Sequence, residues 1–444
     1  MQWRSLPQAV GLSEAYGPSD EQIASGENIL PDLRDGKPDP EHPYENGGVK
    51  NPDSALLKDL GLVPGAKPKP GGIGVPAWRD GGMFREPKVD NKSPYPVGET
   101  KSPGSDYTRT LVIPKLRDEN TTWIQDDLSD ILAPNGPLST AIYAVDDKTA
   151  PLHPPKNKGH EVMVYLSYII DHYDKLPDIS IFMHAHRDAW HNNELLDNLS
   201  PLMIRHLSPE RVTREGYMNL RCHWDPGCPA WLHPGNLERN YEKQEEQIIA
   251  DSWAELFPLE PIPNVLSQPC CAQFAVSRDR LLALPRQRYV SMRDWMLRTD
   301  LSDYLSGRVF EYTWQYIFTS SPIHCPSMSA CYCDGYGLCF GDAKKFDYWF
   351  ELRYKWNECK AELDLWNEQA EILEQWRKSS KDGVIYEEAL LEVPEAGRDV
   401  WLRDKIEQLK AQMDERREAA FELGRDPKQR ALESGREWNE GDGY

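Results

Sequence analysis

The sequence contains no hydrophobic run that is long enough to cross a bilayer. Its longest apolar stretch extends from Val162 to Ile170, whereas a transmembrane helix requires about 20 residues. No signal-peptide pattern follows Met1. We therefore expect no membrane span in the chain as given.

Positive charge is also scarce. The 51 Lys and Arg residues are outnumbered by 72 Asp and Glu residues, which gives a formal net charge of −21 at pH 7. Binding to nucleic acid requires clustered Lys and Arg side chains that contact phosphates. The composition therefore argues against a general nucleic-acid binder and favours a ligand that is neutral or bridged by a metal.

Three common catalytic signatures are missing. The sequence has no G-x-x-x-x-G-K-[ST], no G-x-S-x-G and no H-E-x-x-H, which removes the usual support for nucleoside triphosphatases, α/β-hydrolases and zinc proteases. Its GGIGVP stretch at 71–76 precedes no predicted helix. These glycines are therefore not the phosphate loop of a dinucleotide fold.

Composition divides the chain into four parts. Residues 1–106 hold fifteen of the 36 prolines and fifteen of the 30 glycines without a sustained apolar run, so we predict a disordered arm there. Residues 107–341 have the apolar density of a folded domain. Residues 342–424 are charged and predict a helical extension, and residues 425–444 predict a disordered tail.

The domain begins with a strand–helix–strand pattern. Short β-rich runs occur at 110–113, 141–145 and 179–183, and apolar residues at helical spacing occupy 159–176. This pattern predicts parallel strands whose C-terminal ends gather along one edge of a sheet. Further elements are expected as a strand at 272–276 and as helices at 286–297, 308–318, 344–378 and 397–423.

Five phrases of the sequence carry a resemblance to a known family. They are FMHAHRDAWHN at 182–192, EGYMNLRCHWDPGCP at 215–229, CCAQFAVSRDRL at 270–281, SGRVFEYTWQYIF at 306–318 and HCPSMSACYCDGYGLC at 324–339. From about Thr110 to Gly341 the chain closely resembles a fungal-type family of domains of unknown function, numbered 3431. That family is similar to glycosyltransferases of the GT-A type. The resemblance implies an α/β fold with a GT-A or Rossmann-like mixed sheet flanked by helices.

The resemblance also implies a nucleotide-sugar donor, a carbohydrate or other hydroxyl acceptor, and Mn²⁺ or another divalent metal. The NKGHE segment at 157–161 is similar to the Asn-x-Gly-x-acid turn of some sugar transferases, so Asn157, Gly159 and Glu161 are expected to bind the donor. The alternative for Glu161 is a carboxylate stabilised by a helix dipole. His184-Ala185-His186 stands where such enzymes usually carry Asp-x-Asp.

The densest group of potential metal ligands consists of His184, His186, Asp188 and His191. Imidazole and carboxylate groups together suit Mn²⁺, Fe²⁺ or Zn²⁺, and residues two apart in an extended segment point the same way. We predict a metal site here. The alternative is a structured loop in which the histidines only form hydrogen bonds.

Glu311 is the expected general base, because deprotonating an acceptor hydroxyl requires a carboxylate in a partly apolar site; the alternative is a solvent-facing helix acid. Asp147 follows the second strand and is expected to hold a ribose or a cation, unless it is an ordinary turn residue. Arg278 is expected to bind the diphosphate, Trp314 to stack on the sugar and Gln273 to contact the substrate.

The nine cysteines indicate disulfides and an oxidising compartment. Cys222 and Cys228 are placed for a local bridge, and the group at 325–339 favours disulfides over a zinc site because its spacing departs from paired C-x2-C knuckles. We expect the lumen of the secretory pathway if an anchor or signal precedes Met1, and the cytoplasm otherwise.

The working hypothesis is a metal-assisted transferase that moves a sugar from a nucleotide sugar to a hydroxyl acceptor. The alternative is a non-catalytic protein of the same fold that binds carbohydrate or acts as a scaffold. The missing Asp-x-Asp supports this alternative. In either case we expect the charged C-terminal helices to pack on the domain or to bind a protein partner.

Overall fold

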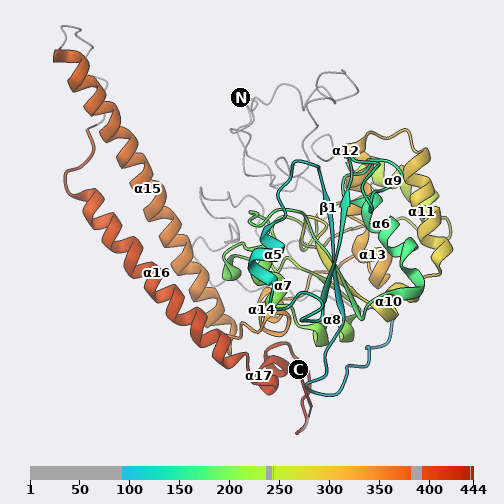
Figure 1. Ribbon diagram of the computed structural model, residues 1–444. Coiled ribbons are helices and arrows are strands. Elements are labelled where there is room, and N and C mark those ends of the chain that lie inside the picture. Colours follow the sequence, from blue (N-terminus) through green and yellow to red (C-terminus); the bar gives the residue numbers. More distant parts are fainter. Residues whose placement is uncertain (1–92, 237–242, 244, 382–392, 441) are drawn as a thin grey trace.

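The computed structural model describes residues 93–236, 243, 245–381, 393–440 and 442–444. These residues form a five-stranded sheet with helices on both faces (Figure 1). The strands are β1 (Arg109–Lys115), β2 (Leu138–Ala144), β3 (Ile179–Phe182), β4 (Tyr217–Asn219) and β5 (Phe274–Ser277). Their order is β2-β1-β3-β5-β4. Strands β1, β2 and β3 are parallel, and β5 runs antiparallel to both of its neighbours. The predicted mixed α/β sheet is confirmed.

Alternating apolar side chains of the strands fill two cores, one on each face of the sheet. In β1, Leu111 and Ile113 belong to one core and Val112 to the other, as the two-residue period of a strand requires. The core around Val112 is covered by α6 (Val162–Asp171), α9 (Glu245–Leu256), α11 (Arg286–Arg298), α12 (Asp303–Glu311) and α13 (Trp314–Thr319). The core around Leu111 is covered by α5 (Trp123–Leu128), α7 (Ser200–His206), α8 (Pro209–Glu215) and α14 (Met328–Tyr336).

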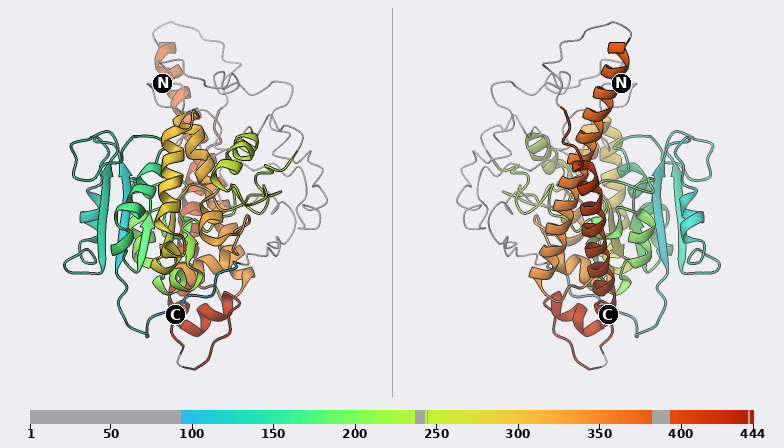
Figure 2. Two further views of the ribbon diagram at one scale, coloured as in Figure 1. Left: turned by 90° about the vertical axis from the view of Figure 1, so that its right-hand side faces the viewer. Right: turned by 90° about the vertical axis from the view of Figure 1, so that its left-hand side faces the viewer.

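The short elements complete this arrangement. A 3-10 turn, η3 (Tyr173–Lys175), follows α6, a second one, η4 (Glu194–Leu196), precedes α7, and the short helix α10 (Arg278–Leu282) follows β5. The side views of Figure 2 show β1 and β2 at one margin of the molecule. No helix among the described residues combines the length and apolar character that a membrane span needs.

The single helix predicted over 308–318 is in fact two helices. Helix α12 ends at Glu311 and α13 begins at Trp314. Gln268, from the loop before β5, donates its side-chain N–H to the Glu311 carbonyl at 2.6 Å, and thereby satisfies an acceptor that the break leaves open. The prediction was wrong because the break depends on a hydrogen-bond donor from a distant loop, which the helical spacing of apolar residues does not reveal.

The two predicted C-terminal helices are present as α15 (Ala343–Lys381) and α16 (Arg398–Leu423), an antiparallel pair that projects from the domain (Figure 1). The Trp349 indole N–H donates to the Met413 carbonyl at 3.0 Å and fixes the two helices to one another. Arg417 forms an ion pair of 2.6 Å with Asp197 of the domain. The base of the pair is therefore attached to the domain.

The tail predicted as disordered over 425–444 is folded where it is described. Helix α17 (Pro427–Glu433) packs against α14. Arg436 forms an ion pair of 2.9 Å with buried Asp334. The polar composition of the tail did not predict this folding, because the residues that the tail contacts lie about 100 residues earlier in the chain.

Eight of the nine cysteines form disulfides, in the pairs Cys222–Cys331, Cys228–Cys325, Cys270–Cys271 and Cys333–Cys339. Disulfides rather than zinc at 325–339 are therefore confirmed, but the predicted local bridge between Cys222 and Cys228 is wrong. Both cysteines lie in the loop after β4 and bond instead to α14 and the segment before it. The fold places these distant segments side by side on one face of the sheet.

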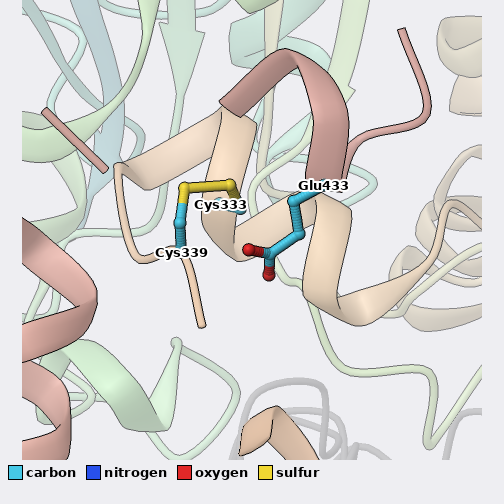
Figure 3. A group of neighbouring side chains, drawn as sticks. All are labelled: Cys333, Cys339 and Glu433. Atoms are coloured by element: carbon cyan, nitrogen blue, oxygen red, sulfur yellow. A yellow bond between two sulfur atoms is a disulfide. The ribbon is translucent and has the colours of Figure 1, made fainter. Parts of the chain in front are cut away.

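The pair Cys333–Cys339 lies beside the carboxylate of Glu433 (Figure 3). The two sulfur atoms are bonded to each other, so neither offers the thiolate that a metal would need. The Glu433 carboxylate accepts the Gly341 backbone N–H at 2.7 Å. This group therefore holds α17 in place and is not a metal site.

Removing the bond between Cys222 and Cys331 by replacing both residues with Ala should lower the free energy of unfolding by about 2–5 kcal/mol, because a bond between distant segments restricts the unfolded chain. The two residues are 109 positions apart. Cys359→Ser is the control, because Cys359 forms no disulfide. Guanidinium denaturation followed by circular dichroism measures both changes, and equal midpoints for the two proteins would contradict the expectation.

The disordered arm predicted for residues 1–106 lies mostly outside the described residues, but its last part, 93–106, contacts the domain. Arg280 lies over the Tyr95 ring, 4.0 Å from its centroid, and Lys101 forms an ion pair of 2.7 Å with Asp178. Residues 93–106 are therefore part of the folded domain, which extends further towards the N-terminus than the predicted boundary at residue 107.

A protein that begins at residue 107 should melt roughly 2–4 °C below one that begins at residue 93, because the lost contacts contribute on the order of 1 kcal/mol. Scanning calorimetry of the two truncated proteins measures the difference. If the two proteins gave the same melting curve, residues 93–106 would not stabilise the domain, and the predicted boundary at residue 107 would stand.

Candidate functional site

Three loops lie close together at one edge of the sheet. Phe182, at the end of β3, pairs with Phe274, at the start of β5, and Asn219, at the end of β4, pairs with the same residue. Because β5 is antiparallel, the segment before it lies beside the segments that follow β3 and β4. We call this place the carboxyl edge.

Gln273 joins the two histidines of the carboxyl edge. Its Oε1 accepts the His184 backbone N–H at 3.0 Å, and its Nε2 lies 3.2 Å from His191 Nδ1 and 2.9 Å from Asn192 Oδ1. His191 Nε2 lies 3.4 Å from His184 Nδ1. Since the amide nitrogen can only donate, His191 Nδ1 accepts and His191 Nε2–H donates to His184. Gln273 therefore fixes the tautomers of both rings.

Both imidazoles are neutral in the folded protein. Burial, together with smaller contributions from nearby His186 and His160, lowers the pKa of His184 to about 3. Burial also holds the pKa of His191 well below its usual value, and the charge of Arg221 acts in the same direction. The pair can form hydrogen bonds to a ligand without carrying charge.

The four residues predicted as metal ligands do not form a metal site as they stand. His184 and His191 use their facing nitrogens for a hydrogen bond to one another, while His186 and Asp188 are exposed. No three of these four bring ligand atoms within 4.8 Å of one another. Strand β3 ends at Phe182, so the alternation of side chains expected for an extended segment does not apply to the residues beyond it. We therefore assign no chemical step to a metal.

Glu311 is 1% exposed and is held from two sides. Arg308 Nη1 donates to its Oε2 at 3.0 Å, and the Cys271 backbone N–H donates to its Oε1 at 3.1 Å. Arg308 also forms an ion pair of 3.2 Å with Glu245. Each carboxylate oxygen has room for a second hydrogen bond, so Glu311 is oriented by these partners without being saturated.

The disulfide between the adjacent residues Cys270 and Cys271 lies at the carboxyl edge. The backbone adopts left-handed conformations at Cys271, with φ of 83°, and at Ala272, with φ of 48°, which side chains other than glycine rarely do. This turn directs the Cys271 N–H to Glu311 while Gln273 reaches the histidines. Backbone strain at functional sites is common when the surroundings hold it in place.

The predicted donor-binding turn at Gly159 is occupied by the protein itself. Asp303 accepts hydrogen bonds from the backbone N–H groups of Gly159 and His160, and its Oδ2 lies 3.7 Å from His160 Nδ1. Gly159 has φ of +73°, and a Cβ atom there would lie 1.9 Å from Met296 Cε. The left-handed backbone therefore favours glycine here, and a larger residue would also require Met296 to move. The N–H groups expected to face a phosphate face a carboxylate.

Glu161 is buried at the start of α6, and its Oε1 has no hydrogen-bond partner among the described residues. Burial raises its pKa well above the usual value, and the negative charges of Glu311 and Asp303 raise it further. Burial therefore favours the protonated form of Glu161. Glu311 differs in having Arg308 within ion-pair distance.

The remaining predicted residues lie outside this cluster. Asp147 follows β2, which β1 separates from β3, and Asn157 is exposed in the loop before α6. Arg278 follows β5 at the opposite edge of the sheet, because that strand is antiparallel. Trp314 is fully buried in the aromatic core and offers no ring face to a sugar.

Comparison with known proteins places the chain among relatives. Residues 111–334, half of the chain, match the family described as "Protein of unknown function (DUF3431)". The chain belongs to this family. Among curated proteins, none matches it.

Solved structures similar to this DUF3431 protein include two of glucosyl-3-phosphoglycerate synthase from Mycobacterium tuberculosis. The complex with Mn²⁺, UDP and phosphoglyceric acid is 17% identical, with 44% of this chain and 66% of that chain covered and a TM-score of 0.23. The complex with Mn²⁺, UDP-glucose and phosphoglyceric acid is 18% identical, with 45% and 68% covered and a TM-score of 0.23. The chain thus spans just under two thirds of the first of these structures. TM-scores this low carry no argument about activity.

Several residues of the DUF3431 site escaped sequence reasoning. Arg308 stands one helical turn before Glu311, which is a readable signal for an ion pair. The adjacency of Cys270 and Cys271 is visible in the sequence, but a bond between neighbours is not implied by it. Asp303 gives no signal, because its partner Gly159 is 144 residues away.

Gln273→Leu should lower the free energy of unfolding by roughly 2–4 kcal/mol, because it leaves buried groups of His184, His191 and Asn192 without a partner. The control is Gln287→Leu on the exposed side of α11, which should stay within about 0.5 kcal/mol of the parent protein. Urea denaturation measures both. A Gln273→Leu protein as stable as the control would mean that the chain of hydrogen bonds does not organise the carboxyl edge.

Proposed function

We propose that this DUF3431 protein transfers a sugar from a nucleotide-sugar donor to a hydroxyl acceptor at the carboxyl edge of its sheet. The supporting observation is that Cys271 and Gln273, two residues apart, contact Glu311 on one side and His184 on the other. Residues predicted separately from the sequence are thus brought together where open α/β sheets bind their ligands.

In the proposal, two carboxyl groups in different surroundings supply the acid and base functions. Burial keeps the pKa of Glu161 high, whereas Glu311 is paired with Arg308. Environments that separate two carboxyl groups in this way are typical of acid–base sites. In the proposal, Glu311 accepts the proton of the acceptor hydroxyl, whose oxygen bonds to the anomeric carbon of the sugar while the bond from that carbon to the nucleoside diphosphate breaks and the diphosphate leaves. Protonated Glu161 donates a hydrogen bond to the sugar.

Neutral His184 and His191 complete the polar surface. Their linked hydrogen bonds through Gln273 fix which ring nitrogens donate and which accept. Hydroxyl groups of a sugar can be bound by such a surface without the desolvation cost of a further charge. In the proposal these residues position the donor and take no part in proton transfer.

One observation favours a second function, the non-catalytic binding of carbohydrate. Glu311 is 1% exposed, and both of its oxygens already accept hydrogen bonds from the protein. A protein of this kind would bind sugar at the same edge without transferring it. Its projecting helices α15 and α16 would then recruit a protein partner.

The experiment that separates these functions begins with thermal-shift measurements on the full chain with UDP-glucose, GDP-mannose and UDP-N-acetylglucosamine, each with and without Mn²⁺. A bound donor stabilises the folded state by about 2.7 kcal/mol at a hundred times its Kd. Dependence of the shift on Mn²⁺ would mean that the donor brings a metal to His186 and Asp188. A shift without turnover would favour the binding protein.

Glu311→Gln should lower the transfer rate about 10²–10⁴-fold and leave the Kd of the donor nearly unchanged, because the amide keeps the shape but accepts no proton. The matched control is Glu245→Gln, which removes the other acidic partner of Arg308 and should stay within a few-fold of the parent rate. Radiolabelled-sugar transfer and donor titration measure the two quantities. Equal rates for the two variants would remove Glu311 from the mechanism.

A further inference from the structure

Arg221 is a buried cation with unused hydrogen-bond donors. It follows β4 at the carboxyl edge and is 2% exposed. Its Nη2 donates to the Asp225 carbonyl at 2.7 Å, but its Nε and Nη1 have no hydrogen-bond partner among the described residues. Buried guanidinium N–H groups are nearly always paired, so two unpaired ones call for an acceptor that a ligand would bring.

The nearest protein acids do not fill this role. Glu194 is near enough to act on Arg221 through its charge, but its carboxylate is bound by Arg353. Asp225 also acts on Arg221 through its charge, but its hydrogen bond to the guanidinium comes from the backbone carbonyl and leaves Nε and Nη1 without a partner among the described residues. Nε and Nη1 point to different sides of the guanidinium, so an anionic group of a ligand, such as a phosphate, would accept a charge-assisted hydrogen bond from one of them.

An apolar surface adjoins this cation. The Trp190 ring has Arg221 over it, 5.3 Å from the centroid. Trp190 and Tyr304 both pack, partly buried, against the disulfide of Cys270 and Cys271. This small cluster is separate from the two main cores of the sheet, so its aromatic rings are not needed to fill either core.

The chemistry of this cluster fits one kind of ligand. Aromatic rings bind the C–H face of a pyranose, and a buried guanidinium binds phosphate. The two features are joined through Trp190, as the sugar and the diphosphate are joined in a nucleotide sugar. Glu311 adjoins the same disulfide, because it accepts the Cys271 N–H.

We propose that Arg221, Trp190 and Tyr304, seated on the Cys270–Cys271 disulfide, form the subsite for the sugar and diphosphate of the donor. This inference rests on the proposed function and names the residues that recognise the donor. Arg221 takes the role that the sequence had suggested for Arg278, and Trp190 and Tyr304 take the role suggested for Trp314.

The test compares ligands that contain one or both parts of the donor. We would titrate UDP-glucose, GDP-mannose, UDP, GDP and inorganic pyrophosphate into the full chain, and follow methyl glucopyranoside and methyl mannopyranoside by saturation-transfer NMR. Trp190→Ala and Tyr304→Ala should each weaken the nucleotide sugar that binds by roughly 3- to 10-fold. Both should leave the sugar-free diphosphates within twofold. Arg221→Lys should weaken sugar-containing and sugar-free diphosphates alike, because Lys lacks the planar fork of donors.

The controls are Trp401→Ala and Arg403→Lys, which lie on α16 away from the sheet and are exposed. They should change none of these affinities. Each variant is first checked by its circular dichroism spectrum and melting curve. Trp190→Phe is the second variant for position 190, because it keeps a ring and should retain most of the sugar binding.

The outcomes separate this inference from the proposed function. If a nucleotide sugar binds and none of the three substitutions weakens its binding, the proposed subsite is wrong. That result would not contradict the proposed transfer function. If no nucleotide sugar binds, the proposed transfer function is contradicted. The sugar part of the subsite is then still supported if the methyl glycosides give a saturation-transfer signal that is lost in Trp190→Ala. If no signal depends on Trp190, the subsite is contradicted as well.

Discussion

Strand β5 lies between β3 and β4 and runs antiparallel to both, so that Phe274 at its start stands beside Phe182 and Asn219 at their ends. This direction brings the residues before β5 to the edge where ligands of open α/β sheets bind. Gln273 can then reach His184, and the Cys271 N–H can reach Glu311. A parallel strand at the same position would send these residues to the far edge, where Arg278 now lies.

The cost of burying polar groups explains the organisation around this edge. A buried charge requires a partner, and Glu311 shares Arg308 with Glu245. Glu161 forms no ion pair among the described residues, and burial raises its pKa. The histidines, linked by one amide, remain neutral. The edge therefore combines a carboxylate paired with a cation, a buried carboxyl group without an ion pair and two neutral imidazoles.

Disulfides and long-range ion pairs hold the loops that carry these groups. Cys222 and Cys228 fix the loop after β4 to α14 and to the segment before it, and Arg221 belongs to the same loop. The projecting helices are tied to the loop after β3 through the ion pair of Arg353 with Glu194. The C-terminal extension and the carboxyl edge are therefore mechanically connected, although they are separate in the sequence.

The sequence by itself determined the elements with strong local signals. The three parallel strands, α6, α11 and the long helices α15 and α16 were predictable, because the period of apolar residues depends only on near neighbours in the chain. Glu311, His184 and Gln273 were also selected from the sequence, but as separate candidates. Strand β4 was missed, because three residues are too few to show a period.

Only the tertiary structure decided which of those candidates meet. The occupation of the Gly159 turn by Asp303, the pairing of the cysteines and the opposite placement of Arg278 all depend on contacts between residues far apart in the chain. Such contacts follow from strand direction and from the packing of helices on two faces, and a local sequence pattern carries no information on either. The chemical properties of each side chain could be inferred from the sequence, whereas its neighbours in space were determined by the fold.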